Sequence, residues 1–185
     1  YNPVFERGQY NMQLTSFAVL KLAGGGTYAA STGENEVALV LLGGRCAVKG
    51  DGFEFPEVGG RENPFDGAPH TVYLPRRTSY EISAVTDLEI AVNMAPASRD
   101  TSKPALITPE MTRSFELGRD NFPRRATVIL DEKFDSEHFY IGEGMIPSGN
   151  WSGYPPHRHD VDNPPEEIDM EETYLSLIHI SEPTR

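Results

Sequence analysis

Two histidines near the end of the chain have the spacing of metal ligands. His157 and His159 stand in "GYPPHRHD" (153–160), after a Pro-Pro pair and before an acid. Side chains alternate along a strand, so residues i and i+2 project from one face and both imidazoles can reach one cation. A site of this kind also needs a carboxylate and commonly another imidazole. The pair therefore predicts part of a divalent-metal site.

The missing carboxylate is expected in "PPEEIDMEETY" (164–174). Glu172 opens an apparent strand, and a rigid element suits a ligand. The alternative is a polar surface loop, because an H-x-H pair also arises by chance in a chain with five histidines. The segment offers four more acids, of which those in the Pro-rich loop are expected to be solvated: Glu166, Glu167, Asp169 and Glu171.

Four other charged or titratable residues have weaker support. His70 in "GAPHTVYLP" and His138 before a strand have no obvious partner ligands, so both are expected to be structural. The pair Arg76 and Arg77 could meet a sugar carboxylate, although arginines in exposed turns are usually solvated.

Three features argue against other chemistries. Cys46 and Ser152 lack a credible base and orienting group, so nucleophilic catalysis is not expected. "AGGGT" (23–27) precedes no helix, so it is not expected to hold a phosphate. Cys46 is the only cysteine, which excludes an intrachain disulfide and a thiolate zinc site.

The elements that must position these residues are strands. Fifteen prolines and seventeen glycines interrupt the chain at the spacing of an all-β sandwich or barrel. Gly43-Gly44 and Asp51-Gly52 are predicted hairpin turns. A turn of helix is expected only at 108–115. The predicted strands span 16–22, 36–42, 45–50, 53–58, 70–75, 79–85, 88–94 and 124–130, with a further one after His138.

The composition divides the chain into two units. An Ala/Pro/Ser/Thr-rich stretch separates them. Segments 16–41 and 138–160 share the order strand, small-residue turn, strand and loop, with a Glu that begins the next strand. Two related barrels in tandem are therefore expected, the second one incomplete. The predicted parts are an N-terminal extension (1–15), a first barrel (16–97), a linker (98–121), the start of a second barrel (122–174) and a tail (175–185).

The tail "LSLIHISEPTR" (175–185) does not continue the strand pattern. Its residues are the translation of a transposase-type sequencing adapter, so we expect a non-native tail and give His179 no role as a ligand. A genuine, divergent C-terminus is the alternative.

The charge of the chain restricts its partners. A net charge of −12 and a pI near 4.8 disfavour binding to nucleic acid and to anionic membrane surfaces. "VALVLL" (37–42) is too short to cross a bilayer. No secretory leader opens the chain, so the cytoplasm is the expected compartment, although the first residue, Tyr1, is not a methionine.

The longer motif resembles a known family. "SGNWSGYPPHRHD" followed by an acidic loop and "EETY", together with "EVALVLLGGRCAVKGDGFEF" and "ENPFDGAPHTVYLPRRTSYEI", is similar to the two-barrel cupins that isomerise sugar acids in myo-inositol and pectin breakdown. This resemblance covers about Ser16 to Tyr174. It implies that His157, His159 and Glu172 bind a divalent metal, with a fourth ligand, a histidine, in a part of the second barrel that lies beyond this chain.

The resemblance also implies a reaction. It is the aldose–ketose isomerisation of 5-deoxy-glucuronate to 5-dehydro-2-deoxy-gluconate, with zinc as the first expectation and manganese or iron as alternatives. The substrate is then a small sugar acid, and a homo-oligomer is expected. As a fragment, the chain would be inactive alone. Two alternatives stay open, a pectin-derived uronate as substrate and a non-catalytic cupin module that binds sugar acids or metal.

Overall fold

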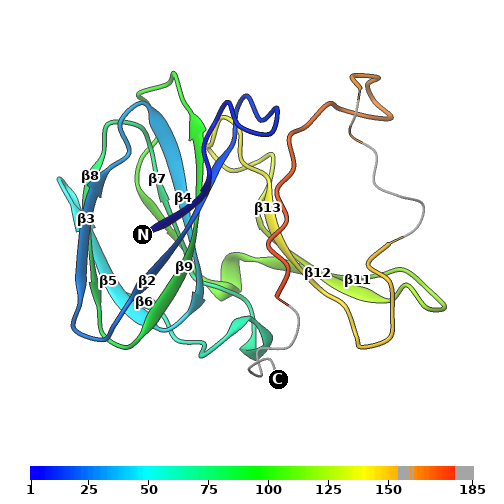
Figure 1. Cartoon of the computed structure of the whole chain (residues 1–185), viewed down its shortest axis with the longest axis horizontal. Helices are drawn as coiled ribbons and strands as arrows, with labels where there is room; N and C mark the ends of the chain where they lie inside the picture. Colours follow the sequence, from blue (N-terminus) through cyan, green and yellow to red (C-terminus); the bar gives the residue numbers. More distant parts are fainter. Residues whose placement is uncertain (154–158, 160, 178–185) are drawn as a thin grey trace.

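The chain folds almost entirely into antiparallel β-sheet. The computed structural model describes residues 1–153, 159 and 161–177, and these residues form thirteen strands and two short 3-10 helices but no α-helix. All ten strand pairings among these residues are antiparallel (Figure 1). The predicted all-β class is confirmed. Within the described part of the chain, no helix is long and apolar enough to cross a membrane.

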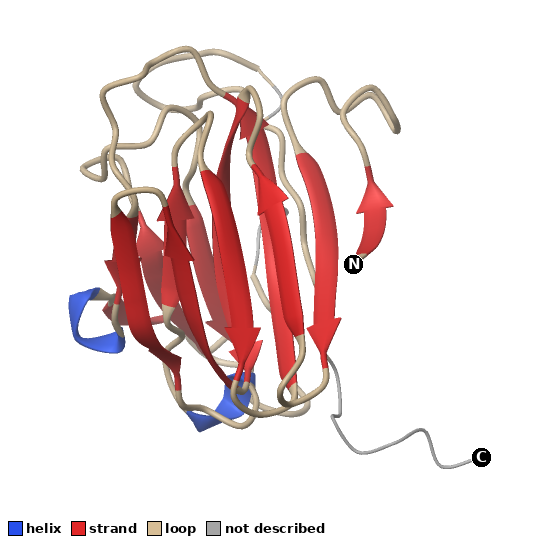
Figure 2. Ribbon diagram, turned by 90° about the vertical axis from the view of Figure 1, so that its left-hand side faces the viewer, coloured by secondary structure: helices blue, strands red, loops and turns tan. Residues whose placement is uncertain are grey.

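The strands belong to three sheets, which lie in layers (Figure 2). The 3-10 helices are η1 (Pro64–Asp66) and η2 (Pro109–Met111). The six-stranded sheet has the order β1 (Asn2–Phe5), β2 (Ser16–Leu22), β9 (Leu88–Pro96), β4 (Asn35–Gly43), β7 (Thr71–Leu74) and β10 (Ala105–Ile107). The four-stranded sheet has the order β3 (Thr27–Ser31), β8 (Ser79–Ala84), β5 (Arg45–Gly50) and β6 (Phe53–Gly59). The three-stranded sheet has the order β11 (Arg113–Leu117), β12 (Arg124–Leu130) and β13 (Ile141–Met145).

The strand order of the first unit is that of a jelly roll. Four strands in the order β2-β9-β4-β7 face four in the order β3-β8-β5-β6, and the chain passes repeatedly from one sheet to the other. This double Greek key is the architecture of cupin barrels. The expected cupin-like barrel is therefore present between β2 and β9.

One of the two predicted hairpin turns is not a hairpin. Asp51 and Gly52 join β5 to β6 as predicted, with Gly50 opposite Phe53. Gly44 instead carries the chain from the six-stranded to the four-stranded sheet. Its φ is +98°, and a Cβ atom there would collide with the Asp87 carbonyl, so the position requires glycine.

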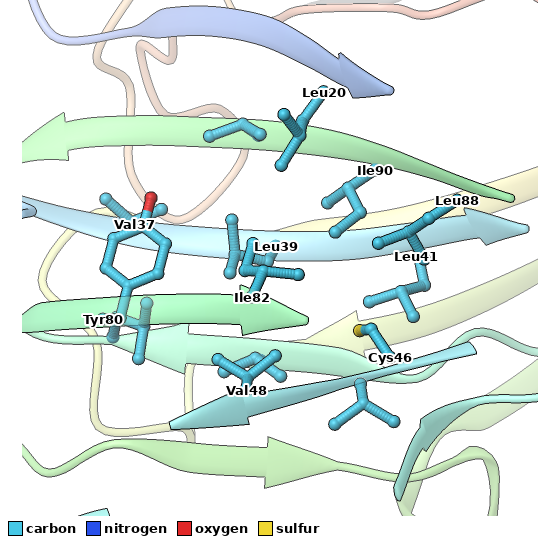
Figure 3. Packing of buried hydrophobic residues seen from close by; sticks show 14 of the residues in the cluster. Leu20, Val37, Leu39, Leu41, Cys46, Val48, Tyr80, Ile82, Leu88 and Ile90 are labelled. Carbon is cyan, nitrogen blue, oxygen red and sulfur yellow. The ribbon is translucent and has the colours of Figure 1, made fainter. Parts of the chain in front are cut away.

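The interior of the barrel is filled by apolar side chains. In β8, Tyr80, Ile82 and Ala84 point inward while the alternate residues are more exposed. Leu39 and Val48 meet them from the two facing sheets (Figure 3). Burying each such side chain contributes about 1.5–3 kcal/mol, so this core is the main source of the barrel's stability.

Strand β4 is buried on both faces, which explains the unbroken apolar run "VALVLL". Leu39 and Leu41 point into the barrel, whereas Ala38, Val40 and Leu42 belong to a second core. That second core lies between the six-stranded sheet and the segment that holds β12, and its other buried members are Phe17, Tyr73, Ala91, Ile107, Ile129 and Leu130. The three-stranded sheet therefore packs against the outside of the barrel (Figure 1).

The ends of the first unit differ from the prediction. The predicted extension, 1–15, contains β1, which pairs with β2. The predicted linker, 98–121, contains β10 on the edge of the barrel sheet and β11 on the three-stranded sheet. The expected helical turn at 108–115 is limited to η2. Unpaired backbone groups on the edge strand β7 favour such pairing, and they accept the short segment Ala105–Ile107 despite the linker-like composition around it.

Candidate functional site

His159 is hydrogen-bonded to the acidic segment that follows it. Its Nδ1 lies 2.9 Å from the Ile168 carbonyl oxygen. The Met170 N–H donates to the His159 carbonyl oxygen at 3.2 Å. The structure therefore holds His159 against residues 168–170, directly before Glu171 and Glu172.

The contact with Ile168 assigns the tautomer of the His159 ring. A carbonyl oxygen only accepts, so Nδ1 carries the proton that forms the 2.9 Å bond. The lone pair of the neutral ring is then on Nε2, the arrangement found in metal-binding histidines that are oriented by a backbone carbonyl.

Glu172 does not open a strand, so the predicted strand at "EETY" is wrong. Residues 171–174 have no regular secondary structure, because no neighbouring strand in the described part of the chain pairs with them. The Glu172 side chain is exposed and accepts a 3.1 Å hydrogen bond from the Tyr174 hydroxyl. Burial, and next the charge of Glu172, raise the pKa of Tyr174.

The predicted ligand set is only partly within the described structure. His157 lies outside the described residues, whereas His159 and Glu172 lie inside them. The described residues alone contain no group of three His, Cys, Asp or Glu side chains that could hold a metal ion. The set of His157, His159 and Glu172 therefore stays a prediction.

Glu171, the neighbour of Glu172, binds the N-terminal segment of the chain. Its carboxylate accepts the backbone N–H groups of Gln13, of Leu14 at 2.9 Å and of Thr15 at 2.9 Å. Burial raises the pKa of Glu171, but the three backbone hydrogen bonds and one from the Thr15 side chain outweigh that effect, and the pKa is lowered. The acids of this loop were expected to be solvated, but Glu167 is 6% exposed and Glu171 binds three N–H groups. Nothing in the pattern of residues 13–15 marks a carboxylate partner.

The turn that leads into the histidine motif is attached to the three-stranded sheet. After β13, the Asn150 N–H donates to the Pro147 carbonyl at 3.2 Å, and the Trp151 N–H donates to the Asn121 carbonyl at 2.9 Å. Gly153 lies beside the guanidinium of Arg124, the first residue of β12. The approach to the motif is thus fixed by β12 and the loop before it.

An ion pair fixes β13 to the barrel. Arg61 donates to both carboxylate oxygens of Glu143, at 2.6 and 2.9 Å. It also donates twice to the Leu41 carbonyl, at 2.7 and 3.0 Å, and once to that of Gly67. The arginine side chain is 5% exposed, so this contact is shielded from water.

Glu36 is a second point of attachment between the two units. The side chain is fully buried on the outer face of β4. It accepts hydrogen bonds from the Tyr73 hydroxyl at 2.8 Å, the Glu137 N–H at 3.0 Å and the His138 N–H at 2.8 Å. The loop before β13 is therefore held to the barrel by a buried carboxylate.

The remaining candidates take structural positions. Burial lowers the pKa of His70; the charge of Glu110 opposes this effect, and the charge of Arg61 adds a smaller lowering. Burial raises the pKa of the Cys46 thiol to about 11, which suppresses the reactive thiolate. The Gly24 N–H donates to the Asp87 carboxylate, so this N–H of the glycine-rich turn is not available to bind a phosphate.

The arginine pair is bound by acids of the chain itself. Arg76 and Arg77 both form ion pairs with Glu34 and with Asp100. Arg76 additionally donates to the Ser98 carbonyl at 2.7 Å. These contacts favour a structural role over recognition of a sugar carboxylate.

Comparison with known proteins gives one family. The family model described as the KduI/IolB family matches residues 4–182. The chain is 37% identical over 169 residues to the 5-deoxy-glucuronate isomerase of Geobacillus kaustophilus HTA426, covering 90% of this chain and 60% of the relative. It is 34% identical over 170 residues to the enzyme of the same name from Bacillus subtilis 168, covering 89% and 62%.

A solved structure agrees with this result. The crystal structure of an IolB-like protein from Salmonella typhimurium LT2 superposes with a TM-score of 0.82 at 27% identity, covering 91% of this chain and 67% of that one. The chain spans about 60% of the length of the curated relatives that it matches. The long family match, the similar sequences and the shared fold show together that this chain belongs to the KduI/IolB family.

Proposed function

We propose that the chain is part of a metal-dependent isomerase that converts 5-deoxy-glucuronate to 5-dehydro-2-deoxy-gluconate in myo-inositol degradation. The observation that carries this proposal is the similarity, over about 90% of the chain, to proteins named 5-deoxy-glucuronate isomerase. Residues 122–174 are, in this proposal, the start of a second cupin barrel. The relatives' greater length supports this, because it leaves room for the rest of that barrel.

The residues proposed as metal ligands have suitable chemistry. Two imidazoles and one carboxylate, His157, His159 and Glu172, form a donor set that suits zinc, manganese or iron. The bond from His159 Nδ1 to the Ile168 carbonyl supports this assignment, because in the neutral imidazole it places the lone pair on Nε2. A fourth ligand, a histidine, is proposed in the part of the relatives that this chain does not cover.

The reaction transfers a proton between adjacent carbons of the sugar acid through an enediol-like intermediate. A bound divalent ion would supply Lewis-acid stabilisation of the oxyanion that develops on the substrate. The contribution of this chain is to orient the donors. Ile168 and Met170 fix the ring and backbone of His159, and the N–H groups of Leu14 and Thr15 fix Glu171, the residue before Glu172. The proton itself requires a base that these residues do not identify.

The experiment uses the natural-length gene product that carries this chain, supplied with zinc or manganese. We expect this protein to convert 5-deoxy-glucuronate, and the assay measures the ketose product. His157→Ala is expected to lose both bound metal and turnover, whereas Ser152→Ala, at an exposed position five residues earlier in the sequence, is expected to retain both. Full activity and metal content in His157→Ala would refute the proposed site.

Two other functions make different predictions in the same assay. A pectin-pathway isomerase would convert the pectin-derived uronate faster than 5-deoxy-glucuronate. A cupin binding module would bind the sugar acid or the metal tightly without any turnover. The names of the curated relatives favour the inositol substrate over both alternatives.

A further inference from the structure

We infer that Glu171 is a positioning residue for the proposed metal site, and that the N-terminal segment Gln13–Thr15 acts through it on Glu172. The inference rests on the proposed function and adds to it a contribution from the other end of the chain. Its basis is the set of hydrogen bonds that Glu171 makes with three consecutive backbone N–H groups.

The three backbone N–H groups form a binding site for the Glu171 carboxylate. The N–H groups of Leu14 and Thr15 both donate to Oε2 at 2.9 Å, and that of Gln13 donates to Oε1. Hydrogen bonds to an ionised acceptor are stronger than those between neutral groups. Residues 13–15 belong to none of the strands, so their N–H groups have no sheet partner that would compete with the carboxylate.

The contact joins parts of the chain that are far apart in sequence. Thr15 and Glu171 are separated by 156 positions. Thr15 immediately precedes β2, a strand that pairs with β1 and β9 in the barrel sheet. Glu171 is thereby attached to a rigid element, although residues 171–177 form no strand of their own (Figure 1, blue and red segments).

The acidic segment is held at two places between the proposed ligands His159 and Glu172. At the first, the ring and carbonyl of His159 bind Ile168 and Met170. At the second, Glu171 binds the segment before β2. Glu172 follows directly after this second attachment, so its backbone position relative to His159 depends on Glu171. Groups that orient metal ligands typically affect metal affinity about 10–100-fold when they are removed.

The test is a zinc titration of the natural-length protein, with a chromogenic chelator as competitor. Glu171→Gln keeps the size of the side chain but removes its charge. We expect its zinc affinity to fall by about tenfold. The matched control is Glu166→Gln, which makes the same chemical change at an exposed acid of the same loop, and its affinity should stay within about twofold of wild type.

A second measurement tests the contact independently of metal. Amide hydrogen exchange of Leu14 and Thr15 in the metal-free protein should be faster in Glu171→Gln than in wild type or Glu166→Gln. Thermal unfolding of each metal-free variant, measured in parallel, establishes that the titrated proteins are folded. Glu171→Asp, which retains the charge, should recover part of the zinc affinity.

The outcomes separate this inference from the proposed function. If His157→Ala loses zinc but Glu171→Gln binds it like wild type, the positioning role is refuted and the metal site stands. If His157→Ala keeps its zinc, the proposed site itself is refuted. Unchanged exchange at Leu14 and Thr15 in Glu171→Gln would refute the contact.

Discussion

Arg61 and Glu143 form a two-bond ion pair that joins the barrel to β13, with nitrogen–oxygen distances of 2.6 and 2.9 Å. Arg61 is buried, and Glu143 is 18% exposed. Both charges are therefore largely removed from water, and each depends on the other for compensation.

Removing Glu143 should destabilise the protein substantially. Glu143→Ala leaves the buried Arg61 with carbonyl acceptors only, so we expect the free energy of unfolding to fall by about 3 kcal/mol in urea titration. The control is Glu116→Ala, which removes the exposed ion pair with Arg125 and should cost less than about 1 kcal/mol. Equal losses in the two variants would contradict a shielded pair.

Removing Glu36 should lower the stability of the fold, because three hydrogen-bond donors share its carboxylate. Glu36→Ala leaves the Tyr73 hydroxyl and two backbone N–H groups unsatisfied, so a loss of about 3 kcal/mol is expected on chemical unfolding. Tyr73→Phe removes one donor and should cost only about 1 kcal/mol. Glu89→Ala, which breaks the exposed pair with Lys21, serves as the control and should have little effect.

Glu137 should contribute to the acid sensitivity of the fold. The Arg99 backbone N–H lowers the pKa of Glu137 below its usual 4.5, and the donors of Ser98 and the Arg99 charge act in the same direction. A carboxyl group whose pKa is lower in the folded state stabilises the fold above the unfolded-state pKa. This contribution is lost as the pH falls through the folded-state value.

Glu137→Gln should therefore be less stable than wild type at pH 7. Its free energy of unfolding should also decrease less than that of wild type as the pH falls from 5 to the pH at which the protein unfolds. Urea midpoints measured across this range provide the comparison. Glu132→Gln, at an exposed acid of the same loop, is the control and should follow the wild-type curve. A wild-type acid profile in Glu137→Gln would show that this carboxylate is not linked to folding.

Cys46 should be unreactive in the folded protein. It is 1% exposed in the barrel core, and burial raises the pKa of its thiol to about 11. Little thiolate is then present at pH 8, where a thiol reagent such as DTNB is used. We expect reaction only after denaturant is added. Rapid reaction of the native protein would indicate that the β5 side of the barrel opens readily.

The strands of the barrel were predictable because local pattern and tertiary burial agree. Strands β2, β5 and β12 begin and end at the predicted residues, 16–22, 45–50 and 124–130, where apolar residues lie between clear turn signals. Strands β1, β3, β10 and β11 lie outside the predicted ranges. All four are edge strands, and their pairing is decided by an available neighbour more than by their own residue pattern.

The site was predictable only in its local part. The i, i+2 spacing of His157 and His159 is visible in a few residues, whereas metal binding by this pair stays a prediction and the hydrogen bond from His159 to Ile168 has no sign in that spacing. The strand expected at Glu172 could not be judged in this way, since a strand exists only if another one pairs with it. The partner of Glu171 was equally inaccessible, because it lies 156 to 158 positions away.

The burial of β4 on both faces has a consequence for any attempt to use the barrel by itself. Ala38, Val40 and Leu42 are covered by the segment that holds Ile129 and Leu130. A truncated barrel ending near residue 97 would expose this apolar strip to solvent, and strips of that kind promote aggregation. We therefore do not expect the jelly roll to remain soluble by itself. The smallest part of this chain that we expect to stay soluble contains both the jelly roll and the segment that holds β12.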